Sequence, residues 1–451
     1  MGRGRQSTIF QRKHWWSLLS SFLILSLLSP CFSDTQQLVG LHRGGPFSDA
    51  IDENATSEAP PAANVTVPLH AHSGTHHVHI YVGSPPQRQT LIVDTGSRVM
   101  SFPCKPCRTC GSHASPYFDP AASTTYKSSR CGKCLLEGIS TCSLFGEQCE
   151  LSQKYTEGSS WSASEVEDLV WLGTPDVLES VEDHMQLAVP FAFGCQTSSR
   201  GLFKKQYADG ILGLARHDTS IVSAYYQAGA ILRNAFSLCM TREGGHMSVG
   251  GSLPKKHHLQ PMQMTPITRE HGWYSVEVDA IYVGDIMVAD KNTKKGSLMK
   301  AVNSGKGCIL DSGTTDTYLP SSLSKAFEAA VHNWTGGLTD FSRRLRVKIY
   351  TFAQFQALPE ITFVLANNAT ISIHPNNYME GVLFQDGTEE VQSWKGTKQL
   401  TNRIYLEDKE GAVLGANALL GHDILYDVQG HQIGIAKAEC SEPVHSLFSQ
   451  S

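Results

Sequence analysis

The strongest constraint on the fold is a short pattern that occurs twice. The segment LIVDTGSRV surrounds Asp94, and CILDSGTTD surrounds Asp311 more than two hundred positions later. Each copy is followed downstream by apolar residues and a glycine, in DGILGLA at 209–215 and in AVLGANALLG at 412–421. Such self-similarity indicates that the chain consists of two related halves.

The rest of the chain predicts a mainly β protein. Short runs rich in Val, Ile, Tyr, Phe and Thr, such as HHVHIYVG, LAVPFAFG and YSVEVDAIYVG, are separated by Gly, Pro and Asn turns. The clearest helical periodicity lies at 322–334, where Leu323, Phe327 and Val331 share one face. With 451 residues, 41% of them hydrophobic, the chain is long enough to bury the cores of two β-rich halves.

The two aspartates are candidates for acid–base chemistry. One Asp-[Ser/Thr]-Gly alone is a common turn, because Asp bonds its own backbone and Gly accepts positive φ. In equivalent positions of two related halves, however, two such carboxyls can face each other, and carboxyls about 3 Å apart hold one proton between them. The pair can then activate a shared water while its protonated member polarises a carbonyl. We predict that Asp94 and Asp311 are catalytic, that the hydroxyls of Ser97 and Thr314 orient them, and that no metal or cofactor is required.

The motifs around these aspartates resemble those of a known family. In chain order, HIYVGSPPQRQTLIVDTGS, DGILGLA, GWYSVEVDAIYVG, CILDSGTTDTYLP and AVLGANALLGHDILYDVQGHQIGIAKAEC are similar to the pepsin-like aspartic proteases, over about His76 to Cys440. The cysteine clusters and YTEGS look most like the plasmepsin V branch and, more distantly, the nepenthesins of plants. The resemblance implies a bilobal fold with a central cleft between two β-rich lobes related by a pseudo-two-fold axis. It also implies an endopeptidase acting on polypeptides, in a branch that includes processing enzymes of the secretory route.

The resemblance assigns further residues to the cleft. The substrate-covering hairpin, the flap, falls on QKYTEGSSWSAS. Pepsin has a Trp after its first motif that bonds the flap tyrosine, whereas this chain has Ser101, so that bond should be absent or replaced. A carboxylate on the flap could pair with an Arg a few residues before the scissile bond, or it could be a solvent-facing hinge residue. The substrate-binding residues expected are Tyr155, Gly96, Gly313, Thr314, Thr315 and Glu157, the last being that carboxylate.

The N-terminus predicts entry into the secretory pathway. Residues 1–33 combine basic residues with an apolar run and small residues, as in a signal peptide. An uncleaved signal anchor is the alternative, although the run is shorter than the roughly 20 residues of a membrane span. No other anchor is evident, and the expected location is extracellular or lumenal, in the endoplasmic reticulum, Golgi or vacuole. Glycosylation sequons fit this route and lie at Asn54, Asn64, Asn333 and Asn368.

The composition of the chain after residue 33 separates a first segment from two expected lobes. Residues 34–70 are rich in Ala, Pro, Ser, Thr and acidic side chains, which predicts a zymogen propeptide or a flexible linker. They contain no Lys, so the plug that a propeptide lysine forms in pepsin is not expected. An N-terminal lobe should then span 71–265, with Asp94, a cysteine-rich insertion and the flap, and a C-terminal lobe 266–451, with Asp311.

Cysteines crowd the segment after the first motif. Their two-residue spacings would suit zinc or an iron–sulfur cluster, but in a secreted chain disulfides are favoured. The crowded cysteines are Cys104, Cys107, Cys110, Cys131, Cys134, Cys142 and Cys149, and the remaining four, Cys195, Cys239, Cys308 and Cys440, predict two further bridges. Eleven cysteines follow the predicted signal, so one should stay free or pair between chains.

Other functions are less well supported. The formal net charge of −5 offers no basic field for nucleic acid. His77 and His79 share a strand face but are interpreted as ordinary strand residues rather than ligands. Two rivals remain: a catalytically inactive binding or inhibitor protein on the same fold, and a disulfide- or zinc-stapled secreted interaction module.

Overall fold

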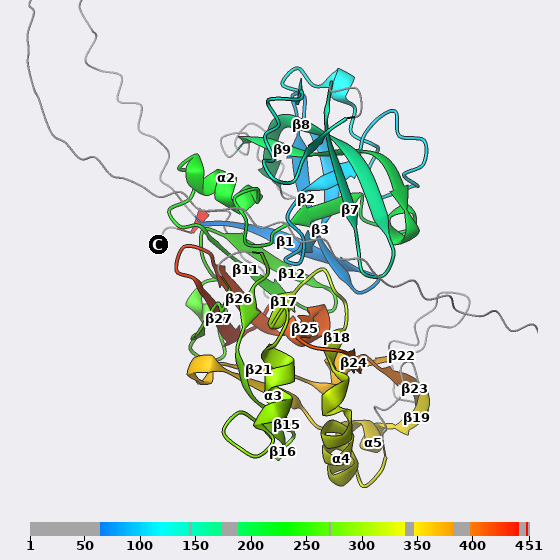
Figure 1. Ribbon diagram of the computed structural model, residues 1–451, viewed down its shortest axis with the longest axis vertical. Coiled ribbons are helices and arrows are strands. Elements are labelled where there is room, and N and C mark those ends of the chain that lie inside the picture. The colour runs from blue at the N-terminus through cyan, green and yellow to red at the C-terminus, as the bar shows by residue number, and fades with distance from the viewer. Residues whose placement is uncertain are drawn as a thin grey trace, which may run out of the picture. The chain divides into compact units, whose positions relative to one another are not determined.

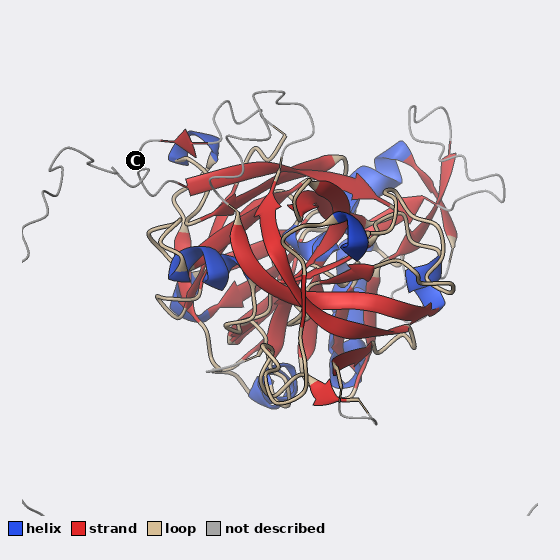
Figure 2. Ribbon diagram, turned by 90° about the horizontal axis from the view of Figure 1, so that it is seen from above, coloured by secondary structure: helices blue, strands red, loops and turns tan. Residues whose placement is uncertain are grey.

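The computed structural model describes residues 64–143, 147–173, 188–269, 272–338, 347–381, 397–441 and 448–449. The predicted signal peptide, Asn54 and most of the 34–70 segment lie outside these ranges. The mainly β fold class is confirmed, since strands make up most of the regular structure (Figure 2). None of the described helices combines the length and apolar character needed to cross a bilayer.

The largest sheet contains strands from both ends of the described chain. Its order is β13-β27-β26-β11-β12-β1-β2-β3-β10-β4-β9-β8-β7-β6, with β28 on β1 and β5 on β8. Figure 1 shows β1, β12, β11 and β26 side by side. The strands are β1 (Asn64–His72), β2 (Thr75–Val82), β3 (Gln87–Asp94), β4 (Ser101–Pro103), β5 (Lys127–Ser128), β6 (Thr141–Cys142), β7 (Cys149–Lys154), β8 (Ser160–Leu172), β9 (Val189–Arg200), β10 (Gly210–Gly213), β11 (Ala235–Met240), β12 (Gly244–Val249), β13 (Gln263–Pro266), β26 (His422–Asp427), β27 (Gln432–Lys437) and β28 (Phe448–Ser449).

Three smaller sheets come from the second half. Their orders are β14-β17-β25-β18-β24, β16-β15-β20-β21 and β19-β23-β22. The strands are β14 (Ser275–Val276), β15 (Val278–Val283), β16 (Ile286–Asp290), β17 (Cys308–Asp311), β18 (Thr317–Pro320), β19 (Lys348–Thr351), β20 (Ile361–Leu365), β21 (Thr370–Ile373), β22 (Met379–Gly381), β23 (Thr397–Asn402), β24 (Ile404–Asp408) and β25 (Ala412–Gly415).

Helices are short. The periodicity at 322–334 corresponds to α4, whose Phe327, Ala330 and Val331 are buried. The α-helices are α2 (Ile221–Gln227), α3 (Gly296–Asn303), α4 (Ser324–Thr335), α5 (Phe352–Gln356), α6 (Pro375–Tyr378) and α7 (Ala416–Leu419), and the 3-10 helices are η1 (Pro120–Ala122), η2 (Gly201–Lys204), η3 (Lys255–His257), η4 (Ser321–Leu323) and η5 (Ala366–Asn368).

The linker predicted for 34–70 does not extend through its last residues. Residues 64–70 belong to β1, which pairs with β12 in antiparallel register. Val65, Val67 and Leu69 alternate with more exposed residues and are buried. The alternation is a strand signal, but the small and polar residues preceding it dominate the composition of the segment.

The repeated motif folds the same way in both halves. In the first, β10 runs parallel to β3 and places Gly213 opposite Asp94. In the second, β25 runs parallel to β17 and places Gly415 opposite Asp311. A Cβ on either glycine would collide with the backbone of the loop that follows the aspartate, so only glycine fits there. The two halves therefore present each aspartate at the end of a strand in an equivalent setting.

Candidate active site

Each aspartate lies against the motif of the other half. A Cβ added to Gly96 would lie 2.7 Å from Asp311 Oδ2, and one added to Gly313 would collide with Asp94 Oδ1. The two carboxyls are close enough to interact through a hydrogen bond. The structure thus brings together four predicted site residues that are far apart in the chain, and the glycines leave room for the opposite carboxyl.

Short hydrogen bonds orient the carboxyls. The Gly96 amide donates to Asp94 Oδ1 over 2.8 Å, and the Gly313 amide donates to Asp311 Oδ1 over 3.0 Å. The Thr314 hydroxyl donates to Asp311 Oδ2 over 2.8 Å. The equivalent hydroxyl, that of Ser97, is buried and makes no hydrogen bond within the described part of the chain, so its role in orienting Asp94 stays a prediction.

Thr95 and Ser312, the central residues of the Asp-Thr-Gly and Asp-Ser-Gly motifs, connect the two halves by hydrogen bonds. The Thr95 amide donates to Ser312 Oγ over 3.1 Å, and the Ser312 amide donates to Thr95 Oγ1 over 3.0 Å. Their hydroxyls donate in turn to the carbonyls of Leu310 (2.9 Å) and Val93 (2.8 Å). Neither Thr95 nor Ser312 was among the site residues predicted from the sequence. The available signal was a hydroxyl at the central position of both copies.

The environment favours the neutral form of the carboxyls. Burial, and then the neighbouring Asp311 carboxyl, raise the pKa of Asp94 to about 7. Burial also raises the pKa of Asp311, while the Thr314 hydroxyl opposes the rise. Two negative charges on adjacent buried carboxylates repel each other strongly. The pair therefore retains one proton at pH values where a solvent-exposed carboxyl would be ionised.

Strands β7 and β8 form a hairpin whose turn carries Tyr155. Burial raises the pKa of the Tyr155 phenol, and the charge of the Asp94 carboxyl raises it further. The Trp161 indole N–H donates to the Tyr155 hydroxyl over 3.4 Å. Ser101 is buried and donates instead to the Gly194 carbonyl over 2.8 Å. As predicted, Ser101 makes no bond to the flap tyrosine, and the bond to Tyr155 comes instead from the hairpin's own return strand.

The other expected substrate-binding residues lie at the edge of this site. Thr315 is half-buried, and its carbonyl accepts from the Asn417 amide over 3.1 Å. A Cβ on Gly74, in the β1–β2 turn, would lie 3.4 Å from Thr315 Cγ2. Glu157 is exposed in the β7–β8 turn, two residues beyond Tyr155.

An exposed tryptophan borders the first motif. The Trp273 indole N–H donates to the Gly96 carbonyl over 3.1 Å, while 43% of its surface remains accessible. This exposed ring is thus held against the loop that follows Asp94. Trp273 was not predicted as a site residue, although it lies in the GWYSVEV motif that located the second lobe.

Disulfides are confirmed, but one prediction about them is wrong. The pairs are Cys104–Cys195, Cys107–Cys110, Cys131–Cys142, Cys134–Cys149 and Cys239–Cys440. The four cysteines outside the cluster make only one bridge among themselves, because β4 and β9 are neighbours and bring Cys104 to Cys195. Among the described cysteines, Cys308 is the one that is free. Burial raises the pKa of its thiol to about 12, which keeps it unreactive.

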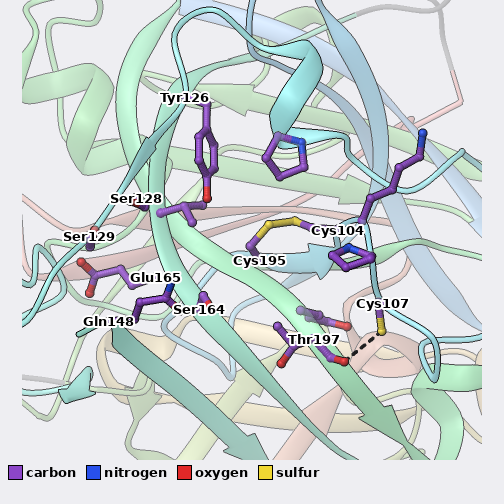
Figure 3. A pocket seen from close by; sticks show the side chains of 15 residues that line it. Cys104, Cys107, Tyr126, Ser128, Ser129, Gln148, Ser164, Glu165, Cys195 and Thr197 are labelled. Atoms are coloured by element: carbon purple, nitrogen blue, oxygen red, sulfur yellow. Dashed lines mark hydrogen bonds between the residues drawn. A yellow bond between two sulfur atoms is a disulfide. The ribbon is translucent and has the colours of Figure 1, made fainter. Parts of the chain in front are cut away.

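Cys104 and Cys107 of the cluster line a cavity of about 220 Å³. Figure 3 shows the Cys104–Cys195 disulfide in its wall, near Glu165, Tyr126 and Gln148. Zinc was the alternative for these cysteines. Of the described residues, only Cys134, Cys149 and Glu165 form a group with ligand-like spacing, but both sulfurs are in a disulfide. The Glu165 carboxylate already accepts from the amides of residues 135 and 136, so this group does not fit a metal.

His77 and His79 do face one another, at 6.3 Å between ring centroids. A third ring, that of His70 on β1, lies 5.6 Å from His77 and 4.9 Å from His79. The nitrogens of the three rings do not converge into a ligand set in this structure. Their interpretation as ordinary strand residues remains a prediction.

Comparisons with known proteins match both halves. The family model described as xylanase inhibitor N-terminal matches residues 76–251, and that described as xylanase inhibitor C-terminal matches 273–437. Aspartyl protease AED1 of Arabidopsis thaliana is 25% identical over 413 residues, covering 87% of this chain and 77% of that protein. Aspartic protease 5 of Toxoplasma gondii is 32% identical over 209 residues, 42% of this chain and 21% of that protein. Plasmepsin V of Plasmodium falciparum is 30% identical over 179 residues, which cover 39% of this chain and 29% of that protein.

Proposed function

The chain belongs to the pepsin-like aspartic proteases, and from that premise we propose that it hydrolyses peptide bonds with a water activated by Asp94 and Asp311. The observation that carries the proposal is the placement of each carboxyl against the glycine of the opposite motif. Raised pKa values at both carboxyls support it, because such values are typical of acid–base catalysts.

The proposed reaction uses one proton held by the pair. The ionised carboxyl takes a proton from water as its oxygen attacks the peptide carbonyl carbon, and the protonated carboxyl gives its proton to the carbonyl oxygen. Collapse of the tetrahedral intermediate breaks the C–N bond: the carboxyl that gained the water's proton gives it to the departing amine, and the other carboxyl takes back a proton from a hydroxyl of the intermediate, so the pair again holds one proton. The amides of Gly96 and Gly313 hold the carboxyls in place through both steps.

The flap supplies cover for this chemistry. Tyr155 sits near Asp94 and is tethered by Trp161, so closure of the β7–β8 hairpin would exclude bulk water from the reacting carbonyl. We assign substrate contacts to Tyr155, Thr314 and Thr315, and add Trp273 because of its bond to the Gly96 carbonyl.

We propose limited processing of secreted or exported polypeptides as the physiological role. Five disulfides suit an oxidising compartment. Asn333 and Asn368 are exposed, as glycosylated residues must be. The relatives include plant and parasite proteins named aspartic proteases, although the parasite matches cover less than a third of those proteins.

Glu157 supports a specific substrate preference. Its exposed carboxylate lies in the flap turn and could form a bidentate pair with an Arg side chain a few residues before the scissile bond. Matched peptides carrying Arg or norleucine at that position test this. Glu157→Gln should reduce the ratio of their cleavage rates toward one, and equal rates with the unaltered protein would refute the preference.

A second candidate is a catalytically inactive inhibitor on the same fold. The observation that favours it is the description of the two matching family models as xylanase inhibitor domains. An inhibitor does not need a proton-sharing pair, yet this chain keeps both aspartates, the Thr314 hydroxyl bond and the flap tyrosine. Digestion of a peptide library separates the two functions, since an inhibitor would release no products.

A further inference from the structure

Strands β7, β8 and β9 carry a hollow of about 290 Å³, whose lining combines six cationic or hydroxyl residues with Gln153 and Trp161. In one row across the sheet Lys154 lies opposite Ser160, and Ser160 lies opposite Arg200. In the next row Ser152, Ser162 and Ser198 are paired in the same way. We call these six residues the flap hollow.

The flap hollow faces away from the aspartates. Neighbouring residues in a strand point to opposite sides of the sheet. Trp161 and Ala163, which alternate with Ser160 and Ser162, are buried in a cluster with Ile92 on the inner side. The six residues of the hollow therefore form a site separate from the proposed catalytic one.

Two positive charges in the flap hollow have no partner among the described residues. No described carboxylate forms an ion pair with Lys154 or Arg200. Glu150 is the acidic residue on the same face of β7. It lies opposite Ser164, two positions before Ser152, and does not line the hollow. The four serine hydroxyls likewise make no side-chain hydrogen bond within the described part of the chain. The hollow thus combines donors and positive charge that nothing in the described protein uses.

We propose that the flap hollow binds a tetrahedral oxyanion, namely a phosphate or sulfate group. Directly opposed residues on adjacent strands have Cβ atoms about 5 Å apart, so one oxyanion over Ser160 is within reach of both flanking side chains. Arg200 can donate two parallel hydrogen bonds to such a group, and Lys154 supplies a mobile point charge. The serine hydroxyls donate to the remaining oxygens.

Occupation of the hollow would act on the flap. A bound oxyanion joins β7 to β9 across β8, and β7 leads directly to Tyr155. The hairpin would open less freely while the anion is bound. This consequence depends on the proposed function, whereas the binding itself does not.

Calorimetric titration of the full chain with inorganic phosphate tests the binding, at constant ionic strength maintained with chloride. Saturable binding is expected, and Lys154→Gln and Arg200→Gln should each weaken it by about fivefold or more, in line with the loss of a charge-assisted hydrogen bond. Lys255→Gln is the matched control, because Lys255 is an exposed lysine on η3 whose replacement makes the same change in charge. No saturable binding, or unchanged affinity in the Lys154→Gln/Arg200→Gln double variant, would overturn the proposal.

Two further titrations identify the source of the oxyanion. Tighter binding of a phosphoserine tetrapeptide than of inorganic phosphate would assign the hollow to modified polypeptides, and equal binding would assign it to free anions. Attachment to phosphatidic acid vesicles without binding of inorganic phosphate would overturn the proposal in favour of a membrane surface. None of these measurements uses peptide cleavage, so failure here leaves the catalytic proposal standing, and failure of the catalytic proposal leaves this one standing.

Discussion

The indole nitrogen of Trp161 lies 3.4 Å from the hydroxyl oxygen of Tyr155 and donates a hydrogen bond to it within one hairpin. The Tyr155 ring also packs against Phe203, with ring centroids 5.0 Å apart. The orientation of the flap tyrosine is therefore fixed by the return strand of the flap and by η2, and not by a side chain at position 101.

Trp161→Phe should lower kcat/KM by about three- to tenfold, the worth of one net hydrogen bond, and should also lower the melting temperature because the smaller ring leaves a void in a buried cluster. Steady-state kinetics on one peptide substrate and thermal unfolding measure the two effects. Trp334→Phe is the matched control, because Trp334 bonds the Ala357 carbonyl in the second half and has no contact with the flap. Equal kcat/KM in Trp161→Phe and the unaltered protein would show that the tether does not position Tyr155.

Thr95→Val and Ser312→Ala should each lower the free energy of unfolding by about 1–3 kcal/mol, since each leaves a buried amide without its acceptor. Either change already breaks the reciprocal pair, so the double variant should lose less than the sum of the single losses. Denaturant unfolding of all four proteins measures this. Strictly additive losses would contradict the reciprocal arrangement.

The raised carboxyl pKa values predict a pH-dependent stability. Folding raises the pKa of Asp94 from its ordinary value near 4 to about 7, so the folded pair binds protons more tightly than the unfolded chain. Its contribution to stability is fully present below about pH 4 and is lost as the pH rises through about 7. Asp94→Asn does not titrate, and its melting temperature relative to the unaltered protein should therefore increase from pH 4 to pH 8.

Thermal unfolding at pH 4, 6 and 8 measures this difference. Asp218→Asn, which makes the same change of side chain at an exposed position, is the control. A constant difference for Asp94→Asn would show that the buried pair does not share a proton. In the same pH range, kcat/KM of the unaltered protein should fall as the pair loses its last proton above about pH 7.

The sequence could predict the two aspartates because their signal is local and repeated. Each motif carries its own strand, turn and glycine, and the repetition places the two copies in equivalent settings. The Trp161 tether depends on the register that pairs Gln153 with Trp161, which a sequence pattern does not reveal. The Cys104–Cys195 bridge depends on the adjacency of β4 and β9, which are almost ninety positions apart. The features that depend on pairing between distant strands could therefore not be predicted from the sequence, whereas those that depend on a local sequence motif could.

The most direct test of the proposed catalytic pair is mass-spectrometric digestion of a peptide library by the purified protein and by Asp94→Asn and Asp311→Asn, at mildly acidic pH. We expect internal cleavage by the unaltered protein and a loss of rate of about a thousandfold in each variant, because each substitution removes the acid or the base of the pair. Both variants should remain folded by thermal unfolding. Cleavage by either variant at the rate of the unaltered protein would contradict the assignment of Asp94 and Asp311 as the catalytic pair.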